Sequence, residues 1–289
     1  MNWLLAPLSH GFMLEALAVG TLVAVTCALL SCFIVLKGWS LMGDAISHAI
    51  LPGVVLAWLI GLPLAIGAFA AGLVCAIGSG MVKTHSRVKE DTAMGVVFTG
   101  MFALGLLMIS QITSDLHLSH ILFGNILGIE REDLIQTLVI GGVALVLIGV
   151  MWRDLQLFCF DPGHARSIGI NVSRLRLILL VVLSASIVAG VQAVGVILVV
   201  ALLITPGCIG YLLTDRFSRM TAIAMGSAAL SNIVGIFISY HANASTAGSI
   251  VLVLSGLFVL ALVLAPRHGL LALGRARRRA LAASASEPT

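Results

Sequence analysis

Six stretches of this chain contain no aspartate, glutamate, lysine or arginine, and each is long enough to cross a lipid bilayer. They cover residues 16–36, 45–82, 92–114, 134–152, 177–214 and 220–266. A transmembrane helix needs roughly 20 predominantly apolar residues. The stretches of 21, 23 and 19 residues therefore suit one crossing each, and those of 38, 38 and 47 residues suit two. This pattern predicts an all-α, polytopic integral membrane protein.

Each of the three longest stretches carries helix-breaking residues near its middle. These are Gly61-Leu62-Pro63, the glycine-containing run 190–195 and the polar run 240–243. Glycine and proline are the strongest local signals for a turn. The breakers predict about nine transmembrane helices, and a single broken helix over 177–214 would reduce the number to eight.

The composition excludes several other classes of protein. Hydrophobic residues make up 60% of the chain and charged residues 10%, against roughly 25% charged in a typical soluble domain. A soluble enzyme, a disordered chain and a nucleic-acid binder are therefore excluded. The apolar runs are continuous rather than alternating, which excludes a transmembrane β-barrel. The sequence also lacks the GxxxxGK[ST], HExxH and GxSxG motifs, so we expect neither ATP hydrolysis by this chain nor an intramembrane enzyme.

The basic residues indicate how the chain is oriented. With Lys37 placed on the cytoplasmic side and the spans alternating, fifteen of the sixteen lysines and arginines fall inside and Arg131 alone falls outside. Cytoplasmic loops of membrane proteins are enriched in these residues. We therefore expect an N-terminus outside, a cytoplasmic C-terminus and an odd number of spans.

The chain is expected to form one membrane domain with short appendages. Residues 1–12 are too short to span the bilayer and suggest an interfacial segment, residues 13–268 form the transmembrane domain, and residues 269–289 form a basic, disordered cytoplasmic tail. The five cysteines have no CxxC spacing. We interpret them as small buried apolar residues.

Asp44 and His48 form the first candidate site. At a spacing of four residues they would share one face of a helix, with a carboxylate oxygen and an imidazole nitrogen in reach of one cation. Such mixed ligands suit Mn, Fe(II) or Zn, and ionisable residues in membrane segments are functional candidates. The alternative is an N-cap role for Asp44 and an ordinary interior histidine. Pro52-Gly53 should kink this helix just beyond the pair.

A second candidate feature is an acidic rim in the predicted outer loop between spans four and five. An acidic mouth raises the local concentration of cations. The alternatives are an ordinary solvated loop and a docking rim for a partner protein. The residues are Asp115, Glu130, Glu132 and Asp133.

The third candidate is a short helix at about 161–170, in the largest inner loop. Asp161 suits the N-cap, Pro162 the first helical position and Gly169 the residue after the helix end. Ala165 and Ile168 should share an apolar face, flanked by His164 and Arg166. Such a helix could dock into a soluble partner, and an idle interfacial helix is the alternative. The residues expected to take part in docking are Asp161, Pro162, Ala165, Arg166 and Gly169.

Several runs resemble signatures of bacterial ABC-transporter permeases for manganese, iron and zinc, most closely the manganese and iron/manganese branch. The resemblance covers about residues 12–268, in order. The runs are Leu41–Gly53, Glu90–Gly95, Ile121–Gly128, Val194–Val199 and Thr246–Val251.

The resemblance implies an inner-membrane permease subunit that receives a divalent metal ion from an extracytoplasmic metal-binding protein and imports it. It implies a homodimer or another paired permease, a separate cytoplasmic ATP-binding subunit, and no permanently bound cofactor. Asp44 and His48 match positions that contact the metal, and 161–169 matches the coupling region. Manganese is favoured, with zinc or chelated iron as alternatives. A secondary transporter driven by an ion gradient is the rival class, since Asp44 and His48 could relay protons.

Overall fold

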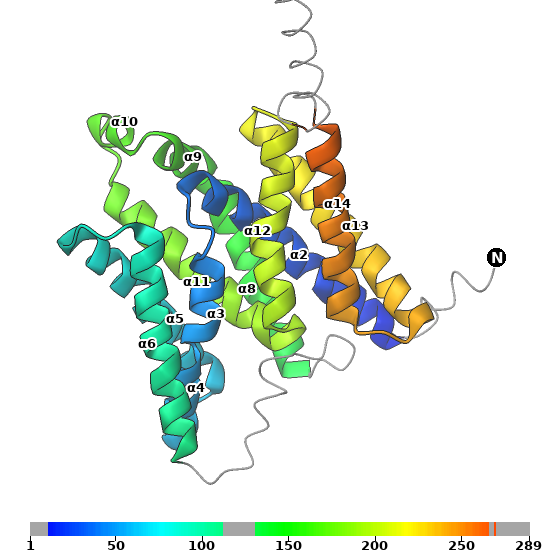
Figure 1. Ribbon diagram of the computed structural model, residues 1–289, viewed down its shortest axis with the longest axis horizontal. Helices are drawn as coiled ribbons and strands as arrows, with labels where there is room; N and C mark the ends of the chain where they lie inside the picture. Colours follow the sequence, from blue (N-terminus) through cyan, green and yellow to red (C-terminus); the bar gives the residue numbers. More distant parts are fainter. Residues whose placement is uncertain (1–10, 112–130, 266–268, 270–289) are drawn as a thin grey trace, which may run out of the picture.

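In the computed structural model, residues 11–111, 131–265 and 269 are described, and this part of the chain consists of helices and their connections without a strand (Figure 1). Most helices are long and apolar. They are α2 (Gly11–Lys37), α3 (Met42–Ala49), α4 (Leu51–Leu59), α5 (Leu64–His85), α6 (Glu90–Ser110), α8 (Arg131–Val150), α9 (Trp152–Phe160), α10 (Pro162–Ser167), α11 (Val172–Val194), α12 (Val196–Leu213), α13 (Phe217–Ala242) and α14 (Thr246–Leu264).

Nine helices of the described part are long and apolar enough to cross a membrane, as predicted. The second of these combines α3 and α4, whereas α9 and α10 are too short to count. The prediction of an all-α polytopic membrane protein is confirmed. The predicted segments 1–12 and 269–289 lie almost entirely outside the described residues.

The predicted breakers separate the spans. Residues 60–63 connect α4 to α5, and Asn243 follows α13 in a left-handed conformation (φ 48°). In the 177–214 stretch, α11 continues through Gly190 and the chain breaks at Gly195, whose φ of 87° favours glycine. The two spans there are separate helices, so nine spans rather than eight are present.

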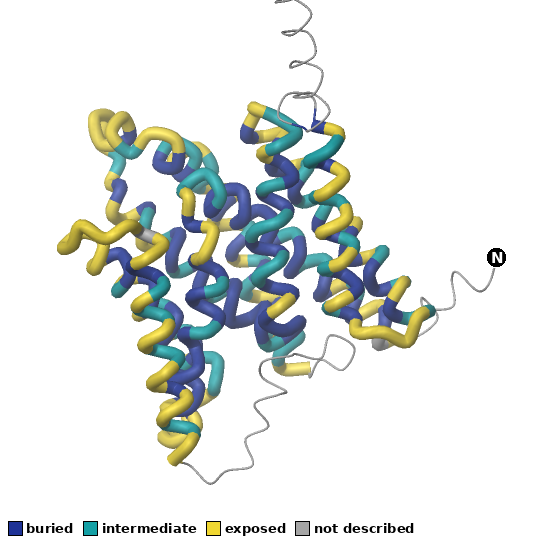
Figure 2. Tube along the Cα trace, viewed as in Figure 1, coloured by how far each residue is buried: buried dark blue, intermediate teal, exposed yellow. Residues whose placement is uncertain are grey.

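The most buried spans are α2, α11 and the one that combines α3 and α4, whereas α6, α8 and α14 are the least buried. Figure 2 shows the exposed outer side of α6. About 72% of the apolar window of α2 is buried, against 17% in α6 and in α8. Large apolar side chains remain exposed on the peripheral helices, among them Leu107 and Val146. Lipid tails would cover such faces in a bilayer.

Several helix ends that carry basic residues lie at one end of the bundle, at the top in Figure 1. The end of α2 with Lys37, the helices α9 and α10, and the connection from α12 to α13 with Arg216 all lie there. Arg131, at the start of α8, lies at the opposite end. This arrangement agrees with the predicted charge asymmetry, and which end faces the cytoplasm stays a prediction.

Candidate functional site

Asp44 and His48 lie on one face of α3, one turn apart. The distance from His48 Nε2 to Asp44 Oδ1 is 3.4 Å, and the two side chains are 36% and 39% exposed, respectively. The N-cap of α3 is Leu41, and no side chain caps this end. Asp44 therefore does not act as an N-cap, and the histidine is not a fully enclosed interior residue.

The rest of α3 explains why this face is open. The other residues of the helix from Met42 to Ala49 are buried. Gly43 lies so close to α12 that a β-carbon there would come within 2.9 Å of Leu203 Cδ1, and the Ser47 hydroxyl donates to the Gly43 carbonyl at 2.8 Å. Small residues on the inner side of α3 thus turn Asp44 and His48 outward from the body of the protomer.

Two aromatic side chains from α6 hold the imidazole of His48. Its ring is stacked against Phe98 at 6.3 Å between centroids and meets Phe102 edge to face at 5.5 Å. Phe98 and Phe102 are one helical turn apart. Their contacts restrict the orientation of the imidazole ring.

The pair supplies two ligands, which is too few for a closed metal site. Among the described residues, no group of three or more His, Cys, Asp or Glu side chains could hold a metal ion. Structural zinc sites use four ligands, and harder divalent cations use six or more. A cation at Asp44 and His48 would need water or ligands from another chain to complete its shell.

The kink predicted near Pro52 lies at Ile50, between α3 and α4. Pro52 has no N–H to donate to the carbonyl of His48, four residues earlier. Just beyond the kink, Gly53 of α4 and Gly67 of α5 are in such close contact that a β-carbon on either would collide with the carbonyl oxygen of the other. These glycines let α4 and α5 pack backbone to backbone.

The short helix predicted at 161–170 is present as α10, with the predicted end signals. The Asp161 carboxylate accepts from the backbone N–H groups of Gly163 and His164, both at 2.9 Å. Pro162 begins the helix. Gly169 follows it with a φ of 86° and donates to the Arg166 carbonyl at 3.0 Å.

The prediction that Ala165 and Ile168 share one apolar face of α10 is wrong. Ala165 is fully buried against its own chain, whereas Ile168 is 55% exposed. Residues three apart share one face of a helix, but Ile168 is the C-cap residue of α10 rather than part of it (φ −92°, ψ 10°), so the helical spacing does not hold for this pair. The exposed residues of α10 and its C-terminal end include His164, Arg166 and Ile168.

The amphipathic helix α9, which directly precedes α10, was not predicted. Its buried residues Leu155, Phe158 and Cys159 have helical spacing, a signal that Arg153 and Asp154 interrupt in the sequence. The Lys37 ammonium lies 3.8 Å from the centre of the Phe158 ring. Burial raises the pKa of the Cys159 thiol to about 12, against a smaller opposing effect of Lys37.

An aromatic cluster anchors α9 to α2 and α13. Phe33 contacts Trp152 at 5.7 Å and Phe217 at 5.1 Å between ring centroids, and Trp152 contacts Phe217 at 5.0 Å. Phe160, the last residue of α9, meets Phe217 edge to face. We refer to Phe33, Trp152, Phe160 and Phe217 as the aromatic cluster; it fixes the segment from which α10 projects.

Half of the predicted acidic rim can be located. Glu132 and Asp133 lie in the first turn of α8, where acidic side chains also complement the helix dipole. Asp115 and Glu130 lie outside the described residues. The rim therefore stays a prediction.

Three comparisons with known proteins agree with one another. The profile of the ABC 3 transport family matches residues 9–265. The chain is 51% identical to the manganese transport system membrane protein MntB of Synechocystis sp., over 94% of this chain and 89% of that protein. It is 50% identical to the chelated iron transport system membrane protein YfeD of Yersinia pestis, over 89% and 86%. The solved structure of PsaBC from Streptococcus pneumoniae in complex with Fab superposes with a TM-score of 0.84 at 36% identity, over 94% of this chain and 99% of that one.

Proposed function

The chain belongs to the ABC 3 transport family, and on this premise we propose that it carries a divalent metal ion across the membrane into the cytoplasm. It is a multi-pass inner-membrane protein and the permease subunit of an ABC transporter, with ATP hydrolysis assigned to a separate subunit. Manganese is the favoured cargo, because the relatives include a manganese transport protein with half of its residues identical. Iron is the cargo named for other relatives.

The open face of α3 carries this proposal. Asp44 and His48 present one oxygen and one nitrogen ligand toward the outside of the protomer, a mixture that suits borderline divalent ions. Two copies of the chain facing each other would bring four such ligands to one cation. Because neither copy holds the ion alone, binding would be weak enough for release, which conduction requires.

Protonation of His48 should oppose transport. A neutral imidazole binds metal through a ring nitrogen, whereas the protonated form has no free lone pair. We therefore expect uptake to weaken as the medium becomes more acidic.

Coupling to ATP hydrolysis is assigned to α10. A cytoplasmic ATP-binding subunit would contact the exposed residues His164, Arg166 and Ile168, and the buried Ala165 would transmit their displacement to the permease. Replacement of Ala165 by proline removes the hydrogen bond from its N–H to the Asp161 carbonyl. ATPase activity that no longer responds to the metal-binding protein is the expected result, with Ser167→Ala as the control on the same helix.

The function is tested with the full complex in proteoliposomes. We expect uptake of radioactive Mn²⁺ that requires ATP and is blocked by vanadate, and we expect His48→Gln to abolish it. His85→Gln, at an exposed position on α5, is the matched control. Uptake that proceeds without ATP and resists vanadate would contradict the proposal and favour gradient-driven transport. Competition by Fe²⁺ and Zn²⁺ ranks the three metals.

A further inference from the structure

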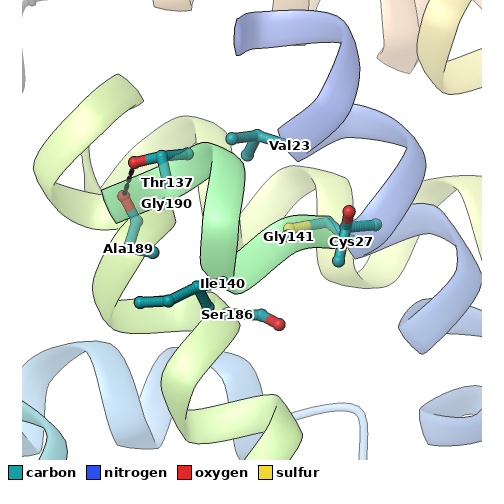
Figure 3. A pocket seen from close by; sticks show the side chains of 9 residues that line it. Val23, Cys27, Thr137, Ile140, Gly141, Ser186, Ala189 and Gly190 are labelled. Carbon is teal, nitrogen blue, oxygen red and sulfur yellow. Dashed lines mark hydrogen bonds between the residues drawn. The ribbon is translucent and has the colours of Figure 1, made fainter. Parts of the chain in front are cut away.

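Three helices that are far apart in sequence enclose a small cavity lined by hydroxyl groups (Figure 3). Thr26 comes from α2, Thr137 from α8 and Ser186 from α11. Gly141 and Gly190 also line the cavity. The volume available to the centre of a water molecule is about 10 Å³, close to what one water needs.

The hydroxyls in this cavity are unusual among those of the bundle. Serine and threonine inside helices commonly donate to a carbonyl three or four residues earlier, as Ser79 does to the Cys75 carbonyl at 2.7 Å. Thr26 Oγ1 and Ser186 Oγ instead have no hydrogen-bond partner within the described part of the chain, although Thr26 is 2% and Ser186 6% exposed. Thr137 makes one long bond, 3.4 Å, to the Ala189 carbonyl.

The hydroxyl of Thr26 faces into the cavity. A β-carbon built on Gly141 would lie 3.5 Å from Thr26 Oγ1, so this oxygen lies close to the glycine of α8, which also lines the cavity. A buried polar group without a partner costs free energy, and native proteins usually satisfy it with ordered water when no protein atom is near.

We propose that this cavity binds one structural water molecule, shared by the unpartnered hydroxyls of Thr26 and Ser186. These two hydroxyls supply the minimum of two polar partners that a buried water needs, while the Thr137 hydroxyl is turned to the Ala189 carbonyl (Figure 3). A metal ion fits poorly, because no charged side chain lines the cavity and neutral hydroxyls do not offset the loss of an ion's hydration. An acyl chain is far too large for the volume.

The bound water adds a polar link between two helices of the bundle. Within a bilayer, apolar contacts give little net drive for association, and small residues and polar contacts hold helices together. Two hydrogen bonds join α8 to α11, from Gln136 Nε2 to Gln192 Oε1 at 2.9 Å and from Thr137 Oγ1 to the Ala189 carbonyl at 3.4 Å. The water would link α11 in turn to α2, through Ser186 and Thr26.

A double-substitution cycle tests the proposal through the apparent midpoint of thermal unfolding of the reconstituted complex. We expect Thr26→Val and Ser186→Ala each to lower this midpoint by about 2–4 °C. The double variant should lose less than the sum, because the first substitution already weakens the water that both hydroxyls share. Ser184→Ala is the control, since this serine is also buried without a partner in the described residues but does not line the cavity.

Two outcomes of this cycle would overturn the proposal. If the cavity is dry, removal of an unsatisfied hydroxyl relieves its desolvation penalty, and Thr26→Val would leave the midpoint unchanged or raise it. Strictly additive losses would mean that the two hydroxyls have separate partners. The control variant should show no coupling to Thr26→Val in either case.

An experimental map of the complex that resolves ordered water gives an independent answer. Density within hydrogen-bonding distance of both Thr26 Oγ1 and Ser186 Oγ is the expected result. Hydroxyls turned instead onto the carbonyls of Leu22 and Val182, four residues earlier on their own helices, would overturn the proposal. Neither test depends on the transported ion, so the failure of the transport proposal would leave this one standing.

Discussion

The open face of α3 and the aromatic cluster near α10 differ in how complete they are within one chain. Phe33, Trp152, Phe160 and Phe217 pack ring against ring, and Phe33 is fully buried. The side chains of Asp44 and His48 are more than one-third exposed. They lie next to each other, and the His48 ring also contacts Phe98 and Phe102. A single chain thus contains the complete aromatic cluster, whereas the cation site that we propose at Asp44 and His48 would need ligands from outside the chain.

The largest expected effect is on the open face. The double variant Asp44→Asn with His48→Gln keeps the size of both side chains but removes the anionic oxygen and the imidazole, so uptake of Mn²⁺ should fall to background. Stability should hardly change, because surface-exposed pairs of this kind contribute about 0–1 kcal/mol. Parallel uptake and unfolding measurements check this. If the double variant unfolded instead, Asp44 and His48 would be needed for stability, as the aromatic cluster is.

The aromatic cluster should respond in the opposite way. Phe33→Ala removes a fully buried ring and should lower the free energy of unfolding by about 3–5 kcal/mol. Phe102→Ala, beside His48 on a partly exposed face, should cost less stability but lower the apparent affinity for Mn²⁺, because the imidazole loses a restraint on its orientation. Unfolding and concentration-dependent uptake are measured for both. If both variants changed stability and affinity equally, the aromatic cluster and the open face of α3 would not have separate roles in stability and in ion binding.

A smaller effect is expected at the start of α10. Asp161→Ala leaves the backbone N–H groups of Gly163 and His164 without their acceptor, a loss that costs about 1 kcal/mol in typical helices. The cost falls on a segment of six residues. We expect a partial loss of the ATPase response to the metal-binding protein, and Asp161→Asn should restore most of it. No rescue by asparagine would argue that the negative charge, rather than the cap, is needed for docking.

The smallest effect concerns Cys159 of α9. Burial raises the pKa of this thiol from 9.0 to about 12, and the thiolate is the reactive species, so alkylation of the folded protein at neutral pH should be slow. As the pH rises above 9.0, the unfolded chain loses the thiol proton first, and the folded state loses stability up to about pH 12. Mass spectrometry before and after unfolding checks the reactivity. Rapid modification of folded protein would mean that α9 opens readily.

The sequence predicted the features that single residues decide. Charged residues bound the apolar stretches, and Gly195 and Pro63 separate spans because their backbones suit turns. The ends of α10 were predictable for the same reason, since Asp161 and Gly169 act within their own segment. The direction of the kink near Pro52 and the packing of Gly53 against Gly67 depend on a second helix, which no local pattern specifies.

The features that the sequence did not predict depend on which other parts of the protein pack against a helix. The buried side of α10 faces its own chain, so Ala165 and Ile168 could not be assigned to one surface from their apolar character alone. The contacts of Phe98 and Phe102 with His48 join α6 to α3 across some fifty residues of sequence. The helix α9 was hidden because Arg153 and Asp154 were interpreted as the end of a span.

The contact between Gly53 and Gly67 limits how this gene can vary. The atom that would lie nearest to a β-carbon on either glycine is the carbonyl oxygen of the other, and an alanine β-carbon (Ala71 or Ala57) comes next. A clash with a side chain can be relieved by a smaller residue at a second position, but a carbonyl oxygen is the same in every amino acid. A substitution at either glycine should therefore not be compensated by a second substitution at the other. Both positions should remain glycine.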